Sequence, residues 1–132
     1  MTTDYICPKC KAHLLLNDYL ILTARKANGT GMLLLMNPEV GNYETVYHPS
    51  CKVKDGERFT FSCPVCHNTL VSELNKNLVM VLMKDESGKE YELHFSAIAG
   101  QKCTYKIMGN SVSSFGIDAP HCLDVMGLLD LA

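Results

Sequence analysis

The stretches CPKCKAHL (residues 7–14) and CPVCHNTL (residues 63–70) decide the fold of this chain. Each begins Cys-Pro-x-Cys and places a leucine, Leu14 or Leu70, four residues after its second cysteine. A spacing of two residues lets both sulfurs of one tight turn face a single cation, and proline presets the turn by fixing φ near about −65°. Each copy supplies two of the four ligands of a tetrahedral metal, so two copies supply the four thiolates of a closed structural zinc site. The predicted ligands are Cys7, Cys10, Cys63 and Cys66.

The repetition also predicts how each turn is supported. We expect the backbone amides beyond the first cysteine of each motif to point at the thiolates and stabilise their charge. We expect Leu14 and Leu70 to pack beneath the metal as equivalent halves of a pseudo-symmetric pair.

Together with the strand-like residues before them, Tyr5-Ile6 and 59–61, the two motifs resemble the knuckles of zinc-ribbon proteins, which have rubredoxin-like metal sites. The resemblance implies a β-hairpin scaffold and a metal held by four cysteines. Two features depart from it. The intervening segment, Lys11 to Ser62, has 52 residues against about 15–20 in the compact pattern, and Lys11 and His67 stand where glycine often follows the second cysteine. Zinc ribbons occur in transcription, translation, enzyme and adaptor proteins, so the resemblance indicates a site and not an activity.

Two other interpretations of the paired motifs remain open. Independent redox pairs would each sit at the start of a helix in a βαβ unit, and no such unit is readable in the sequence. Iron suits the same cage of four thiolates, but we favour zinc because nothing else in the sequence suggests electron transfer.

Further cysteines and histidines are weaker candidates. His48 and Cys51 have HxxC spacing and could add metal ligands, although an unpaired cysteine near a strand is more often a small buried hydrophobe. His13 and His67 lie within three residues of a predicted ligand. Either could replace a cysteine or hydrogen-bond to the site, but we expect both to be exposed on the surface.

No catalytic arrangement can be argued from the sequence. His121 and Cys122 are adjacent and would diverge by about 100° on a helix, and Cys103 and His94 would meet only by an accident of strand register. There is no phosphate-binding glycine motif, and a zinc closed by four cysteines has no position for water or substrate. We therefore expect a protein that is not an enzyme.

The composition of the chain limits the classes of protein to which it could belong. The chain has 132 residues, of which 47% are hydrophobic and 20% charged, as in a folded domain with a real core. A net charge of −2 disfavours a nucleic-acid footprint. No apolar run approaches the roughly 18 residues of a membrane span. Seven cysteines without an export signal suggest reduced thiols and metal binding rather than a disulfide framework. We expect a soluble cytoplasmic protein without a membrane partner.

Alternating apolar residues and turn signals predict hairpins. Residues 19–26 and 32–36 form a pair around ANGTG, residues 78–95 fold around Ser87-Gly88, and residues 103–115 fold around Gly109-Asn110. Residues 43–48 and 58–62 read as further strands, and 96–101 as a helical turn or a loop. Only the tail predicts a helix, with Asp118 as N-cap and Pro120 in the first turn.

The predicted fold is mainly β. A zinc-ribbon-type site carries a long inserted hairpin, and further antiparallel hairpins and a short C-terminal helix follow. Residues 1–70 would form the metal-bearing part and 71–132 a second unit, unless the two are continuous. The predicted function is that of a zinc-stabilised binding or adaptor protein. It would bind a protein partner, or it would self-associate through an apolar stripe of the tail. The alternatives are a nucleic-acid-binding zinc ribbon and a rubredoxin-like iron protein.

Overall fold

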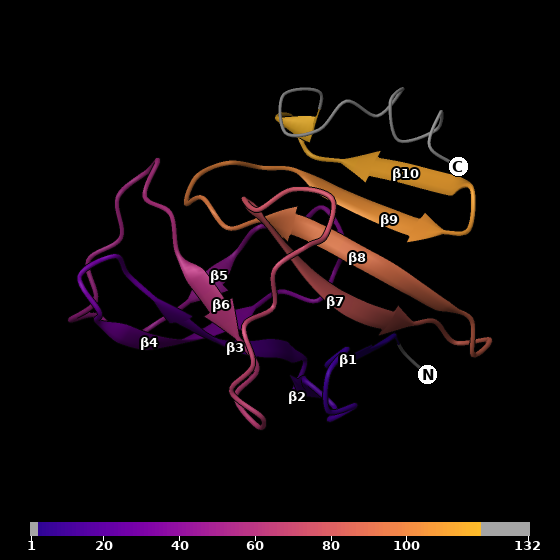
Figure 1. Cartoon of the computed structure of the whole chain (residues 1–132), viewed down its shortest axis with the longest axis horizontal. Coiled ribbons are helices and arrows are strands. Elements are labelled where there is room, and N and C mark those ends of the chain that lie inside the picture. The colour runs from indigo at the N-terminus through magenta and orange to yellow at the C-terminus, as the bar shows by residue number, and fades with distance from the viewer. Residues whose placement is uncertain (1–2, 120–132) are drawn as a thin grey trace.

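The computed structural model describes residues 3–119, which are built from strands (Figure 1). Ten strands in this range form two five-stranded sheets, and every pairing between strands is antiparallel. The prediction of a mainly β protein with antiparallel hairpins is thus confirmed. The tail helix, predicted with Asp118 as N-cap and Pro120 in its first turn, would lie beyond Ala119 and so outside the described residues, and every named element within residues 3–119 is a strand.

The first sheet has the order β1-β7-β8-β9-β10, with bounds Asp4–Ile6, Leu78–Lys84, Glu90–Ser96, Thr104–Met108 and Ser111–Phe115. The hairpins predicted around Ser87-Gly88 and Gly109-Asn110 are β7–β8 and β9–β10. A long-range pairing adds β1, with Ile6 opposite Leu82, at the edge of this sheet. The start of the chain is therefore hydrogen-bonded to its second half.

The second sheet holds β2 (Leu15–Leu16), β3 (Tyr19–Arg25), β4 (Gly31–Met36), β5 (Thr45–Val46) and β6 (Thr60–Ser62). The β3–β4 hairpin is the one predicted around ANGTG. The opposite edge of β3 is shared, because β2 pairs with its first residues and β6 with its last.

One predicted segment differs from the structure, and a second, left open between two alternatives, is resolved by it. The strand expected over residues 43–48 is reduced to the two residues of β5, because the chain then bends into a turn closed by the Cys51 N–H and the His48 carbonyl at 2.9 Å. For residues 96–101 the sequence leaves open a helical turn or a loop, and the structure shows the loop: Ser96 ends β8, and the residues after it contain one turn-type hydrogen bond, from Gln101 N–H to the Ile98 carbonyl at 3.2 Å.

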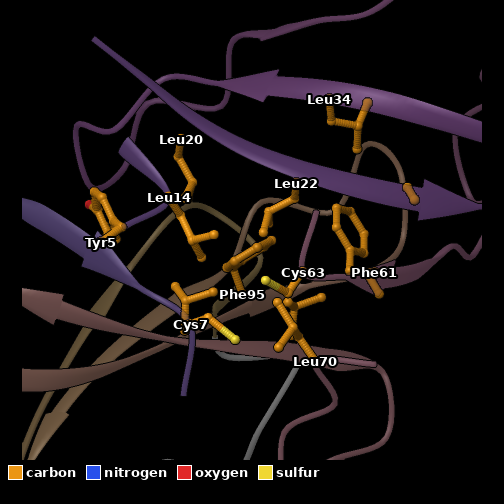
Figure 2. Close-up of a cluster of buried hydrophobic side chains, with 14 of the residues drawn as sticks. Tyr5, Cys7, Leu14, Leu20, Leu22, Leu34, Phe61, Cys63, Leu70 and Phe95 are labelled. Carbon is orange, nitrogen blue, oxygen red and sulfur yellow. The ribbon is translucent and has the colours of Figure 1, made fainter. Parts of the chain in front are cut away.

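One core lies between the two sheets, because alternate residues of each strand point inward. From β3 it receives Leu20, Leu22 and Ala24, and from β7 it receives Val79, Val81 and Met83. Cys7 and Cys63 belong to the same buried cluster and are both 0% exposed (Figure 2). The first cysteine of each motif is therefore part of the hydrophobic core.

The other face of the first sheet carries a smaller buried cluster of Leu78, Cys103, Tyr105 and Ala119. His94 is buried on this face too, since it is paired with Tyr105 across β8 and β9.

No helix in residues 3–119 has the length and apolar character needed to cross a bilayer.

Candidate metal centre

The four predicted ligand cysteines meet at one point in the structure. The sulfur atoms of Cys7, Cys10, Cys63 and Cys66 all lie within 4.8 Å of one another. The Cys7 Sγ lies 3.8 Å from the Cys66 Sγ, and the Cys10 Sγ lies 3.8 Å from the Cys63 Sγ. Both of these close pairs join one motif to the other, so neither motif is complete alone.

The spacing of the sulfurs fits a tetrahedral metal. A zinc–sulfur bond of about 2.3 Å predicts a distance of about 3.8 Å between two sulfurs of a regular tetrahedron, which is about 1.63 bond lengths. The two sulfur pairs that join the motifs are separated by this distance. A disulfide would bring two sulfurs to about 2.05 Å, and all four thiols are free. The cluster could therefore hold a metal ion, and a cage of four sulfurs suits zinc or iron.

Each motif is built by the same hydrogen bonds. The N–H groups of Lys9 and Cys10 donate to the Cys7 Sγ at 3.3 and 3.4 Å. In the second motif, the equivalent two N–H groups donate to the Cys63 Sγ at the same two distances. Hydrogen bonds to the charged form of a group favour that form. The turns thus stabilise a thiolate at the first cysteine of each motif, as the sequence predicts.

The residue after each second cysteine has a left-handed backbone. The φ angles are 65° at Lys11 and 66° at His67. The N–H groups of Lys11 and His67 donate to the carbonyls of Cys7 and Cys63, each at 2.9 Å, and so close the two turns. This conformation explains why glycine is common here in zinc ribbons, and it is less favourable for a residue with a side chain.

The two leucines tie the turns to the core. The Leu14 N–H donates to the Tyr5 carbonyl at 2.7 Å, and the Leu70 N–H donates to the Phe61 carbonyl at 2.9 Å. Both leucine side chains are 2% exposed and lie in the cluster that contains Cys7 and Cys63 (Figure 2). The predicted pair of leucines beneath the site is confirmed.

The pKa values of Cys10, Cys63 and Cys66 are shifted, and the shifts differ in direction. Hydrogen bonds from the backbone of Asn68 and then from its side-chain amide, whose nitrogen is 3.3 Å from the Cys66 Sγ, lower the pKa of Cys66 to about 6. A backbone hydrogen bond from Ala12 acts to lower the pKa of Cys10, but burial and the neighbouring thiols outweigh it and raise this pKa to about 11. Burial also raises the pKa of Cys63. Four ionised thiolates at these distances would repel one another, so a cation at the centre is needed to stabilise all four.

The weaker ligand candidates lie outside the cluster. His13 is largely exposed, and its Nδ1 is 2.6 Å from an Asp4 carboxylate oxygen. His67 is exposed as well. The Nδ1 of His48 is 2.7 Å from the Ser50 hydroxyl oxygen, and Cys51 has a free thiol. The structure therefore places none of these four residues, His13, His48, His67 or Cys51, within the four-cysteine cluster.

The structure also places some of the remaining cysteines and histidines, for which the sequence predicts no pairing. His94 faces Tyr105 across the strands and not Cys103. Cys103 is disulfide-bonded, so the expectation that the thiols are all reduced is wrong for this residue. His121 and Cys122 lie outside the described residues.

Sequence reasoning missed a buried polar network around His94. Its Nδ1 is 2.7 Å from the Ser72 hydroxyl oxygen, and its Nε2 is 3.0 Å from a Glu92 carboxylate oxygen. This order of serine, histidine and carboxylate is that of a hydrolytic triad. Ser72 and His94 are only 4% and 2% exposed, however, and the Ser72 hydroxyl oxygen also accepts the Leu74 N–H at 3.0 Å. The network therefore satisfies buried polar groups and does not present a nucleophile to a substrate.

Family models, curated proteins and solved structures were compared with the chain, and none of them matches it. Function must therefore be inferred from the four-cysteine cluster and the surfaces around it.

Proposed function

We propose that the protein is a non-enzymatic binding protein whose fold is stabilised by one zinc ion held by Cys7, Cys10, Cys63 and Cys66. The two sulfur pairs at 3.8 Å, each bridging the two motifs, are the observation that carries this proposal. The metal would join the turn between β1 and β2 to the turn that follows β6. It would thereby close the 52-residue segment between the motifs, which otherwise costs chain entropy.

The arrangement supports a structural metal rather than a catalytic one. Four thiolates complete the coordination of zinc and leave no position for water or substrate. Two of the ligands, Cys7 and Cys63, are fully buried in the core. When bound, zinc would supply charge neutralisation and a cross-link, and the residues of this chain would supply the recognition surface.

A protein partner is favoured by the outer face of the second sheet. Leu33 on β4 and Val46 on β5 are 50% and 51% exposed, and Ile21 and Leu35 lie opposite each other on the same face. Exposed apolar patches mark interaction sites. β5 pairs with β4 only at Leu35 and Met36, so the preceding residues of β4 have no strand partner on that side within the described chain. An extended segment of a partner protein could hydrogen-bond to this edge.

Nucleic acid is the weaker alternative. The chain has 12 basic and 14 acidic residues, whereas phosphate binding relies on a surplus of lysine and arginine. A titration against DNA and RNA at several salt concentrations separates the two functions, because binding through phosphates weakens steeply as salt rises.

The first test is metal analysis of the purified full chain. We expect close to one zinc per chain and no visible colour, whereas bound iron would absorb visible light. The double variant Cys63→Ser/Cys66→Ser should lose the zinc and unfold more easily, since structural zinc contributes on the order of 10 kcal/mol in isolated fingers. A folded double variant with unchanged melting would refute a structural metal.

The second test concerns the partner surface. The double variant Leu33→Ser/Val46→Ser should retain its zinc but lose the proteins that co-purify with the tagged wild-type chain. As a control, Val65→Ser changes an apolar side chain that is 60% exposed and lies in the second cysteine motif, away from this sheet face. Equal recovery of the same proteins with all three forms would rule out the outer face as the binding surface.

A further inference from the structure

A cavity of about 350 Å³ lies between the two sheets. Its apolar lining comes from both sheets and from the segments next to them. The deepest contributors are Met32, Leu34, Phe59, Phe61, Phe95 and Ala97. None of the four clustered cysteines lines it.

The packing of the core changes along its length. The six deep lining residues keep 5–8% of their surface exposed, although they belong to the central core. Leu22 and Val81, in the same core, are 0% exposed, and Leu70 beside the cysteines is 2% exposed. The core is therefore closed at Leu22, Val81 and Leu70 and reaches solvent through the cavity at its six deep lining residues.

The cavity is open to solvent on one side and large enough to hold a small molecule. Protein interiors hold few voids larger than a water molecule, whose share of liquid volume is about 30 Å³. The cavity is roughly ten times larger, and it lies within the range of about 300–1,000 Å³ that is typical of small-molecule sites. Water gains little at the deep end of the cavity, because the six deep side chains offer it no hydrogen bonds.

Aromatic groups dominate the floor. Phe61 on β6 and Phe95 on β8 meet edge to face, with ring centroids 5.8 Å apart and an interplanar angle of 85°. Met32 and Met36 line the cavity from β4. Aromatic rings and thioethers both make favourable contacts with an aromatic guest.

The mouth of the cavity is polar, and its lining includes one positively charged side chain, that of Lys102. Asp55, Gly100 and Lys102 line the cavity and are exposed. The Asp55 carboxylate lies against Gly100, since an added Cβ on that glycine would be 2.8 Å from its Oδ1. Lys102 takes part in none of the ion pairs found within residues 3–119. Its long side chain is therefore free to follow an anionic group at the mouth.

We propose that this cavity binds a small aromatic molecule with an anionic group. The aromatic body would lie against Phe61 and Phe95, and the anionic group would stay at the mouth beside Lys102. This site is separate from the metal centre and from the outer face of the second sheet, so it can fail or succeed independently of the function proposed above.

Anilinonaphthalene sulfonate, an aromatic anion, is a suitable probe for fluorescence titration of the full, zinc-loaded chain. We expect one saturable site. Ala99→Leu, which adds bulk to a lining residue, should weaken binding at least tenfold, and Lys102→Gln should weaken it several-fold. The matched control Ala27→Leu changes an exposed turn residue outside the cavity and should leave binding unchanged.

Methyl NMR of the unmutated protein locates the probe without relying on a variant that could misfold. The probe should shift the methyl signals of Met32 and Met36, which line the cavity, and not those of Met80 and Met108, which do not. Absence of saturable binding would overturn the proposal. So would binding that ignores Ala99→Leu or shifts Met80 and Met108 instead.

Discussion

Replacing either left-handed residue of the two knuckles by glycine should stabilise the protein. Lys11 and His67 have φ angles of 65° and 66°, and both side chains are exposed, so the substitution removes strain without removing a buried contact. A left-handed backbone costs a residue with a side chain about 1–2 kcal/mol. The greater freedom of glycine in the unfolded chain takes back about 0.5–1 kcal/mol. The mid-range values, about 1.5 and about 0.75 kcal/mol, leave an expected net gain of about 0.75 kcal/mol at each site.

The gain is measurable as a shift in melting temperature. For a chain of this length, 1 kcal/mol corresponds to a shift of about 3–4 °C, so Lys11→Gly and His67→Gly should each raise the midpoint by about 2–3 °C. The free zinc concentration must be held constant, because bound metal itself shifts the midpoint.

The matched control for this experiment is Lys9→Gly. Lys9 is exposed in the same knuckle and carries the same charge as Lys11, but it is not among the residues with positive φ. This control should lower the midpoint. If Lys11→Gly and His67→Gly lower it by as much as Lys9→Gly does, backbone strain at the knuckles is not relieved by glycine and the reasoning is refuted.

Three further predictions follow from other parts of the fold. Gly116→Ala should destabilise the protein by more than about 2 kcal/mol, because a Cβ there would overlap a neighbouring backbone carbonyl. At Gly109 an added Cβ meets no atom within 4 Å, so Gly109→Ala should cost less stability when both variants are unfolded in a denaturant titration. Burial lowers the pKa of His94, so unfolding takes up a proton near neutral pH, and stability should fall as the pH drops below about 6.5. His94→Gln should reduce this dependence of stability on pH when the two proteins have the same metal content. An unchanged slope of stability against pH would mean that other titrating groups cause it. His48→Ala and Cys51→Ser should each keep the zinc content of the wild type, and loss of metal from either would show that the ligand set is incomplete.

The hairpins could be predicted from the sequence because their signals are local. An alternating apolar run, a turn containing glycine and a second run specify β7–β8 and β9–β10 without knowledge of the rest of the chain. The pairings of β1 with β7 and of β3 with β6 could not be predicted in this way. Short strands three residues long carry little pattern, and their partners are chosen by packing between distant segments.

The four-cysteine cluster was predictable for the same local reason, and its surroundings were not. The Cys-Pro-x-Cys spacing fixes the direction of two sulfurs within one turn, so two copies imply four ligands. That Cys7 and Cys63 are buried in the core follows only from the packing of the two sheets. The cavity and the buried hydrogen bonds of His94 also arise between segments far apart in sequence, and no local pattern indicates them.

X-ray absorption spectroscopy at the zinc edge of the purified full chain tests the central claim most directly. The sulfur spacing of 3.8 Å in both inter-motif pairs predicts four sulfur neighbours at about 2.3 Å and no nitrogen or oxygen in the first coordination shell. A zinc ion with fewer than four sulfurs, or with a histidine or water ligand, would contradict a closed site made by Cys7, Cys10, Cys63 and Cys66.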